Sequence, residues 1–133
     1  MLADDDLGST REDVSDPLNP LYVEAFKAIE RDPNQMMAVF ERDDGVVGCL
    51  QLSFIPGLSY VGLWRGQIES VRIAKTARGG GLGRQMIQWA IDECRARGCG
   101  LVQLSAHKSR EDAHRFYGSL GFEATHEGLK LTL

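Results

Sequence analysis

The run Arg78-Gly79-Gly80-Gly81-Leu82-Gly83 combines a cluster of glycines with the start of an amphipathic segment. Because glycine has no Cβ, the backbone N–H groups of such a turn can approach a ligand closely. A helix that begins there adds unpaired N–H donors and the positive end of its dipole. The run therefore predicts a binding site for a phosphate or pyrophosphate group.

Two common phosphate-binding motifs do not match this run. In the P-loop, Arg84 would occupy the position of the required lysine. The dinucleotide fingerprint G-x-G-x-x-G can begin at Gly79 and Gly81, but its third glycine falls on Arg84. The pattern R-x-x-G-x-G does match, with Arg78, Gly81 and Gly83 at its fixed positions, and it resembles the acetyl-CoA signature of the GNAT superfamily of N-acyltransferases. Taken alone, a glycine turn of this length is as compatible with a structural loop.

A second motif strengthens the resemblance. The segment from Asp112 to Phe122, DAHRFYGSLGF, looks like the A-x-x-F-Y-x-x-L-G-F segment of GNAT proteins. The two motifs occur in the expected order, separated by a predicted strand at residues 101–105. The resemblance extends from about Met36 onward, and it implies an acetyl-CoA-dependent N-acetyltransferase.

Apolar periodicity predicts the elements around both motifs. Residues 68–73 alternate apolar and polar side chains, as a half-buried strand does. From Leu82 the apolar residues recur at helical spacing, and Gly98 is the residue type that ends a helix in a left-handed conformation. A capping box at residues 109–112 predicts a second helix, closed by Gly121. The glycine turn therefore joins a strand to a helix.

The other predicted elements complete a single domain over residues 1–133. The first is a helix that starts at Pro20, with Asn19 as its cap, and ends at Arg31-Asp32-Pro33. A hairpin of strands 36–41 and 46–54 follows, with Asp44-Gly45 at its turn. A loop at 55–64 and a last hairpin of strands 122–125 and 129–133 complete the set. This order predicts an α/β fold with a mixed sheet, in which the strands at Glu69 and Leu101 are parallel neighbours. The GNAT resemblance implies that these two strands splay apart to admit the pantetheine arm.

The start of the chain departs from the GNAT pattern. GNAT domains usually begin with another strand and helix, which the residues before the helix at Pro20 cannot hold. Either the start is truncated or this member lacks its first strand and helix. In both cases we expect the strand at 36–41 to lie near the sheet edge, covered by a homodimer partner or by the acidic segment 3–16. That segment stands where the family has a loop beside the acceptor site, so it indicates either a cationic amine acceptor or a solvated terminus.

The resemblance assigns roles to individual residues. Tyr117 matches the tyrosine that donates a proton to the departing CoA sulfur, although its periodicity also suits a core residue. Glu69 is the candidate general base, with a solvent-facing residue as the alternative; a water or His107 could also serve as the base. The residues expected at acetyl-CoA are Val71, Arg72 and Ile73 on the strand, Arg78, Gly79, Gly80, Gly81, Leu82, Gly83 and Arg84 at the turn, and Arg110 and Phe116 in the second motif. Arg110 stands where many members carry an asparagine.

The implied reaction is transfer of an acetyl group to a primary amine, of a small molecule or of a protein, by direct attack in a ternary complex. The alternative is a module that binds CoA and regulates a partner without catalysis.

Composition excludes other classes. A formal net charge of −4 argues against general nucleic-acid binding, and no apolar run approaches the roughly 20 residues of a membrane span. The three cysteines, Cys49, Cys94 and Cys99, lack metal-site spacing. We expect them to be reduced thiols in a cytoplasmic protein without a metal site, the first two buried and Cys99 partly exposed.

Overall fold

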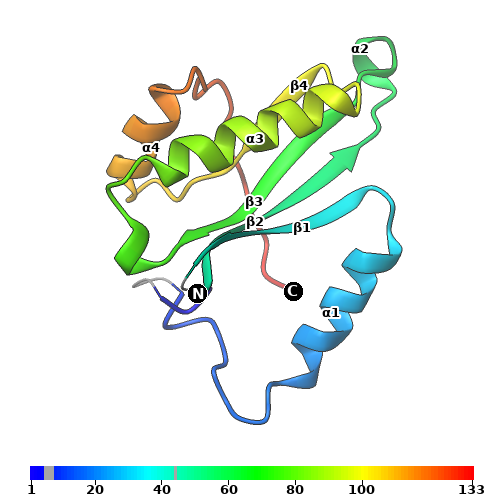
Figure 1. Cartoon of the computed structure of the whole chain (residues 1–133). Helices are drawn as coiled ribbons and strands as arrows, with labels where there is room; N and C mark the ends of the chain where they lie inside the picture. The colour runs from blue at the N-terminus through cyan, green and yellow to red at the C-terminus, as the bar shows by residue number, and fades with distance from the viewer. Residues whose placement is uncertain (5–7, 44) are drawn as a thin grey trace.

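The computed structural model describes residues 1–4, 8–43 and 45–133. Its elements are α1 (Pro20–Arg31), β1 (Gln35–Arg42), β2 (Gly45–Ile55), α2 (Ser59–Gly62), β3 (Arg65–Ile73), the 3₁₀ turn η1 (Lys75–Ala77), α3 (Leu82–Ala96), β4 (Leu101–Leu104) and α4 (Glu111–Gly118). These strands form one sheet in the order β1-β2-β3-β4 (Figure 1). The pairs β1–β2 and β2–β3 are antiparallel, and β3–β4 is parallel. The predicted mixed α/β sheet and its parallel pair are therefore confirmed.

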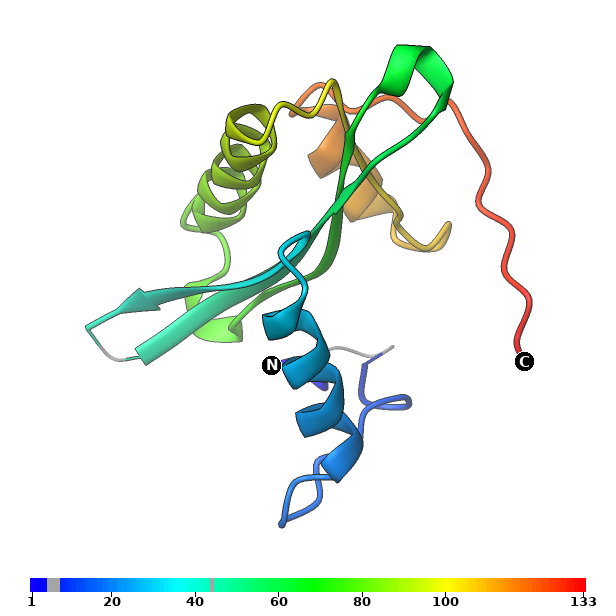
Figure 2. The same ribbon diagram turned by 90° about the vertical axis from the view of Figure 1, so that its right-hand side faces the viewer.

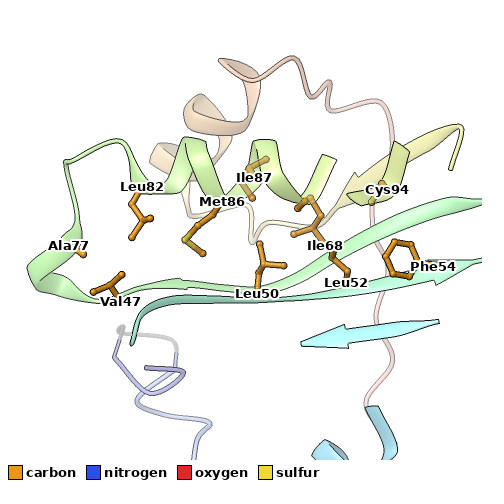
Figure 3. Packing of buried hydrophobic residues seen from close by; sticks show 11 residues of the cluster. Val47, Leu50, Leu52, Phe54, Ile68, Ala77, Leu82, Met86, Ile87 and Cys94 are labelled. Atoms are coloured by element: carbon orange, nitrogen blue, oxygen red, sulfur yellow. The ribbon is translucent and has the colours of Figure 1, made fainter. Parts of the chain in front are cut away.

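The hydrophobic core lies between one face of the sheet and α3. Its members from the sheet and from the helix face one another (Figure 3), and they include Leu50, Leu52 and Phe54 of β2, Ile68 of β3, and Met86, Ile87, Ala90 and Cys94 of α3. Full burial of a large apolar side chain contributes about 1.5–3 kcal/mol. This contact therefore fixes α3, and with it the glycine turn, against β3.

The cysteines behave as the sequence predicts. Cys49 and Cys94 are buried and unpaired, and Cys99 is partly exposed. Burial raises the pKa of the Cys94 thiol to about 11. The thiol is therefore protonated at neutral pH and packs as a small apolar group.

One glycine of β3 provides a test of this packing. A Cβ at Gly66 would overlap the Sγ atom of Cys94. We expect Gly66→Ala to lower the free energy of unfolding by about 1–3 kcal/mol, because the buried helix has to move away from the strand. Urea denaturation measures the change. Cys94→Ala frees the same space, so the double variant should lose less stability than the sum of the two single variants. Strict additivity would contradict the predicted contact.

α1 begins where the sequence predicts and covers the β1 side of the molecule. The side chain of Asn19 accepts a hydrogen bond from the Leu21 N–H at 3.0 Å, and proline occupies the first turn of the helix. α1 lies beside β1, on the far side of the sheet from α3 (Figures 1 and 2). β1 is an edge strand, as expected, and its hairpin with β2 is confirmed. Asp44, which we predict for the turn of this hairpin, lies outside the described residues.

Three local predictions are wrong or incomplete. The capping box fails, because Arg110 is the N-cap of α4 and the Ser109 hydroxyl instead contacts His107. α4 ends at Gly118, and Gly121 closes a turn after it with a φ of 90°. The loop at 55–64 contains the short helical turn α2. Among the described residues, no helix combines the length and apolar character that a membrane crossing needs.

The predicted C-terminal hairpin is absent. Residues 122–133 contain no assigned strand, although Phe122 still packs against the core. Leu129, Leu131 and Leu133 are almost fully exposed. The alternating sequence of this segment is typical of a strand, but in this chain the segment does not join the sheet.

Candidate active site

A gap opens where β3 and β4 stop pairing. The last pair joins Ile68 and Leu104, where β4 ends, whereas β3 continues to Ile73. Immediately after the last pair, Ser70 has a φ of 52° and the register between β2 and β3 shifts. Such a bulge bends a strand and redirects its backbone groups. The expected splay of the two parallel strands is therefore present.

The backbone of β3 presents N–H groups to this gap. The Ala74 N–H bonds to β2 at 2.9 Å, so Ile73, and Val71 two residues earlier, face away from β2. Consistent with this direction, the carbonyl of Val71 accepts a hydrogen bond from the Arg72 guanidinium at 2.9 Å, and that of Ile73 accepts one from Arg78 at 3.1 Å. The N–H group of each residue points to the same side as its carbonyl. Val71 and Ile73 thus offer donors of the kind that stabilise a developing oxyanion.

The glycine turn forms an open cradle before α3. Gly79 and Gly81 have φ values of 82° and 77°, and a Cβ at Gly79, Gly80 or Gly81 would meet nothing within 4 Å. No side chain caps the start of α3, so the N–H groups of its first turn are open to a ligand. Gly83 differs, because a Cβ there would meet the Phe116 ring at 3.3 Å. The turn therefore suits a pyrophosphate, as in acetyl-CoA, and Gly83 and Phe116 pack the helix start against α4.

The side chains expected at the phosphates have contacts within the chain. The Arg78 guanidinium contacts the main chain and the carboxylate of Asp4. Arg84 bonds to the hydroxyl of Ser119 at 3.2 Å, which links the start of α3 to the end of α4. The side chain of Leu82 is buried in the core, so only its backbone can face a ligand. These contacts position the turn, and the groups that it leaves open to a ligand are chiefly backbone N–H groups.

Tyr117 lies on α4 at the edge of the core. Its ring packs edge-on against Phe116 and Phe122, with centroid distances of 5.2 and 5.9 Å. Burial raises the pKa of the Tyr117 phenol, and the positive charges of Arg110 and Arg72 partly oppose that shift. The phenol therefore holds its proton at neutral pH, beside two cationic side chains that would stabilise a nearby anion.

Glu69 lies at the gap, on the other face of the sheet. Ile68 is buried beneath α3, so the strand alternation directs Glu69 to the opposite face, where its side chain is exposed. Tyr117 packs with the core on the α3 face. The structure thus does not bring Glu69 and Tyr117 together on one face. A group bound in the gap would have Glu69 on one side and Tyr117 on the other.

The face that carries Glu69 also carries polar residues that the sequence analysis does not identify. Gln35 accepts hydrogen bonds from Gln51 at 3.1 Å and from Ser53 at 2.7 Å, and Gln103 donates to Gln67 at 2.7 Å. We call these five residues the glutamine face. In the sequence, polar residues recur at every second position of neighbouring strands. This recurrence predicts that they lie on one surface beside Glu69.

The ring of His107 holds a loop, and Trp64 lies away from the gap. The His107 ring contacts the hydroxyl of Ser109 at 2.7 Å and the Ser109 N–H at 3.2 Å, so it organises the loop before α4. Trp64 precedes β3, about 16 Å along the strand from Glu69 at the usual rise per residue. Trp64 is therefore not a neighbour of Glu69.

Acidic residues at the start of the chain are engaged within the chain. Asp4 lies 3.0 Å from Lys75, Glu12 accepts a hydrogen bond from the Tyr22 hydroxyl at 2.8 Å, and Asp13 accepts one from Asn19 at 2.9 Å. Where it is described, the segment therefore contacts the region of the glycine turn and the start of α1.

The glycine cradle, the splayed strands and the two sequence motifs define an acetyltransferase of the GNAT type, and comparison with known proteins agrees. Residues 3–122 match the family model described as "Acetyltransferase (GNAT) family", so the chain belongs to this family. It is 34% identical over 105 residues to an aminoalkylphosphonate N-acetyltransferase of Salmonella typhimurium, which covers 79% of this chain and 68% of the relative. It is also 34% identical over 88 residues to a glucosamine 6-phosphate N-acetyltransferase of Trypanosoma brucei brucei, with 66% of this chain and 58% of the relative covered.

Solved structures share the fold. A protein from Bacillus halodurans C-125 described as a transcriptional regulator is 50% identical, with a TM-score of 0.97 over all of this chain and 89% of that chain. A putative acetyltransferase from Agrobacterium tumefaciens has a TM-score of 0.83 at 23% identity, over 96% of this chain and 86% of that one. At that identity the second likeness shows the fold alone.

Proposed function

We propose that this protein transfers an acetyl group from acetyl-CoA to a primary amine by direct attack in a ternary complex. The observation that carries the proposal is the open glycine turn at the start of α3, which follows the part of β3 that extends beyond its pairing with β4. Relatives at 34% identity are N-acetyltransferases, which supports the same chemistry.

The residues of the chain would divide the work as follows. The backbone of residues 79–84 holds the pyrophosphate, and acetyl-CoA supplies a thioester that an amine can attack. The N–H groups of Val71 and Ile73 stabilise the negative charge that develops on the carbonyl oxygen. Tyr117 gives its proton to the sulfur as the C–S bond breaks, and Arg72 and Arg110 stabilise the anionic sulfur until then.

Glu69 would accept the proton of the amine from the other face of the sheet. An alkyl ammonium has a pKa of about 10.4, so almost none of it is nucleophilic at neutral pH. The carboxylate can attract the cation, but a carboxylate in water is too weak a base for an ammonium. Glu69 would take the proton through an ordered water once the bound substrates exclude solvent from its side chain. Glu69 then deprotonates the amine from one face of the sheet, and Tyr117 protonates the departing thiol from the other.

The Glu69 role predicts a specific kinetic change. Glu69→Gln keeps the shape of the side chain and removes its charge, so we expect kcat to fall about 100-fold and KM for the amine to rise. Affinity for CoA should not change. Glu24→Gln removes an exposed carboxylate of α1 and is the matched control. Wild-type kcat and KM in Glu69→Gln would assign the base to water or to another residue.

The acceptor we propose is a small amine that carries a phosphonate or phosphate group. Both curated relatives are named for such amines, an aminoalkylphosphonate and glucosamine 6-phosphate. In this chain, burial raises the pKa of Tyr117, and Arg110 and Arg72 lie close enough to oppose that rise, so positive charge lies near the Tyr117 hydroxyl. The glutamine face adds neutral hydrogen-bonding groups next to Glu69.

An amine panel tests the proposed function. Release of free CoA thiol from acetyl-CoA is followed with 2-aminoethylphosphonate, glucosamine 6-phosphate, their analogues without the phosphorus group, and a lysine peptide. We expect thiol release that depends on an amine and is fastest with a phosphorus-containing one, together with an acetylated product by mass spectrometry. Thiol release only with the amines that lack a phosphorus group would reject only the acceptor class. No release with any amine would reject the enzyme.

The alternative is a module that binds CoA and regulates a partner. One observation favours it, since the solved protein with 50% identity is described as a transcriptional regulator. Binding alone needs the glycine turn but not Tyr117 or Glu69. CoA binding by calorimetry without thiol release in the panel would support this alternative.

A further inference from the structure

α3 ends in a turn that brings two cysteines together. The Gly98 N–H bonds to the carbonyl of Arg95, and the Cys99 N–H bonds to the carbonyl of Cys94, both at 2.9 Å. With Gly98 at a φ of 76°, these two bonds define a Schellman motif. In this motif the residue after the glycine commonly packs against the residue five positions before it. The two contacting positions are occupied here by Cys99 and Cys94.

The two thiols are close enough to influence each other. Burial raises the pKa of the Cys94 thiol to about 11, and the nearby Cys99 thiol adds to the rise. Burial also raises the pKa of Cys99, but Cys94 and the positive charge of Arg97 oppose that rise. The opposite signs mean that the Cys94 thiol donates toward a Cys99 thiolate. Cys99 is therefore the member of the pair that ionises first.

Accessibility gives the two cysteines different parts in an oxidation. Cys94 is fully buried in the core between α3 and the sheet (Figure 3), whereas Cys99 is partly exposed. An oxidant from solution can therefore reach Cys99 but not Cys94. An accessible thiol that is oxidised first, with a second thiol beside it that resolves the product, is typical of cysteines that form reversible disulfides. Cys49, the remaining cysteine, is buried in β2, where its thiol faces the carbonyl of Ser70 at 3.9 Å.

The pair lies where α3 meets the parallel strands. A Cβ at Gly66 of β3 would overlap the Sγ atom of Cys94, and Gly66 pairs with Val102 of β4. Cys99 lies two residues before β4 begins. A bond between the two sulfur atoms would therefore join the last turn of α3 to the connection that leads into β4.

We propose that Cys94 and Cys99 form a reversible disulfide when the protein meets hydrogen peroxide or a small-molecule disulfide such as glutathione disulfide. With peroxide, the Cys99 thiolate attacks one oxygen. An S–O bond forms, the O–O bond breaks, and the second oxygen leaves as water with the proton that Cys99 released.

The buried thiol completes the reaction. Cys94 loses its proton and attacks the sulfenic sulfur of Cys99, so that the S–S bond forms and the S–O bond breaks. The oxygen leaves as a second water with the proton from Cys94. The two thiols together give up two electrons, which reduce one peroxide to two waters.

Peptide mapping tests the bond. The folded, full-length protein is treated with hydrogen peroxide at a concentration that fully oxidises free glutathione, its remaining thiols are alkylated in urea, and it is digested with trypsin. Trypsin cuts after Arg95 and Arg97, so the two cysteines fall on separate peptides, residues 85–95 and 98–108. We expect mass spectrometry to find these peptides joined, and to find them separate after reduction with dithiothreitol. A sulfinic acid at Cys99 beside an alkylated Cys94, a link between two Cys99 residues, or three alkylated cysteines would each overturn the proposal.

Glutathione disulfide tests the order of the steps. Its reaction passes through a mixed disulfide between Cys99 and glutathione, which Cys94 then displaces, so that two glutathione thiols leave. We expect the wild-type protein to carry the linked pair and no bound glutathione. Cys94→Ala removes the displacing thiol, so glutathione should stay on Cys99 as a gain in intact mass that dithiothreitol reverses.

Cys49→Ala is the matched control, because it also replaces a buried cysteine by alanine. It should behave as the wild-type protein does, and circular dichroism verifies the fold of both variants. Equal amounts of bound glutathione in the wild-type protein and in Cys94→Ala would show that Cys94 does not displace it, and would reject the disulfide.

Discussion

Replacement of Tyr117 by phenylalanine is expected to lower kcat about 100-fold or more with little change in stability. The substitution keeps the ring contacts with Phe116 and Phe122 and removes only the hydroxyl that would protonate the departing sulfur. KM for acetyl-CoA should change little, because the glycine turn supplies most of the binding. Steady-state kinetics and thermal unfolding measure both effects on the same preparation.

A phenylalanine variant with the wild-type kcat would make Tyr117 a core residue and leave the sulfur to be protonated by water or by His107. Phe116→Leu provides a control for packing, since it alters the same aromatic cluster without removing a hydroxyl. Loss of stability only in Phe116→Leu, with loss of kcat only in Tyr117→Phe, would separate the chemical role from the structural one.

The pH dependence of stability should also report on Tyr117. Burial raises the pKa of its phenol in the folded protein. The neutral phenol is therefore favoured by folding, and its contribution is complete below the ordinary tyrosine pKa of about 10. It is lost as the pH rises from that value through the raised folded-state pKa. Urea denaturation between pH 8 and 11 should show a steeper loss of stability in the wild-type protein than in Tyr117→Phe.

Substitutions in the glycine turn should abolish most of the affinity for CoA. Gly80→Val adds a side chain where the structure is open and where the backbone does not have a positive φ, so any loss reports the space that the pyrophosphate needs. Gly81→Val adds backbone strain, because Gly81 has a φ of 77° at the start of α3. We expect affinity to fall more than about 10-fold in both variants, and further in Gly81→Val, since two of its effects act together.

Calorimetry with CoA measures these affinities, and circular dichroism verifies the fold. Gly128→Val is the matched control, because a Cβ there also meets nothing within 4 Å and the residue is not part of the turn. If affinity for CoA is retained in Gly80→Val and lost only in Gly81→Val, binding depends on the conformation of the turn. It then does not depend on close approach of the backbone to the pyrophosphate. Unchanged affinity in both would remove the pyrophosphate from this turn.

The sequence predicts the parts of the site that depend on local backbone chemistry. Gly81 and Gly98 have the left-handed conformations that their positions at the ends of α3 require, and Asn19 caps α1 as its residue type favours. The strand at 68–73 and the helix after it follow from periodicity alone. These features are predictable because each depends on residues close together in the chain.

Features that depend on distant partners are less predictable. Ser109 has the sequence of a capping residue, but the ring of His107 takes its hydroxyl. Residues 129–133 have the alternating pattern of a strand, yet the predicted strand is wrong, because the segment pairs with no strand among the described residues. The glutamine face appears only when four strands are placed in register, since no single strand carries more than two of its members.

A crystal structure of the protein with acetyl-CoA tests the site most directly. The pyrophosphate should contact the backbone N–H groups of residues 79–84, and the thioester should lie between β3 and β4. Its carbonyl oxygen should accept a hydrogen bond from the N–H of Val71 or Ile73, with the sulfur within hydrogen-bonding distance of the Tyr117 hydroxyl. A cofactor bound outside the gap, or a sulfur beyond the reach of Tyr117, would contradict the proposed mechanism.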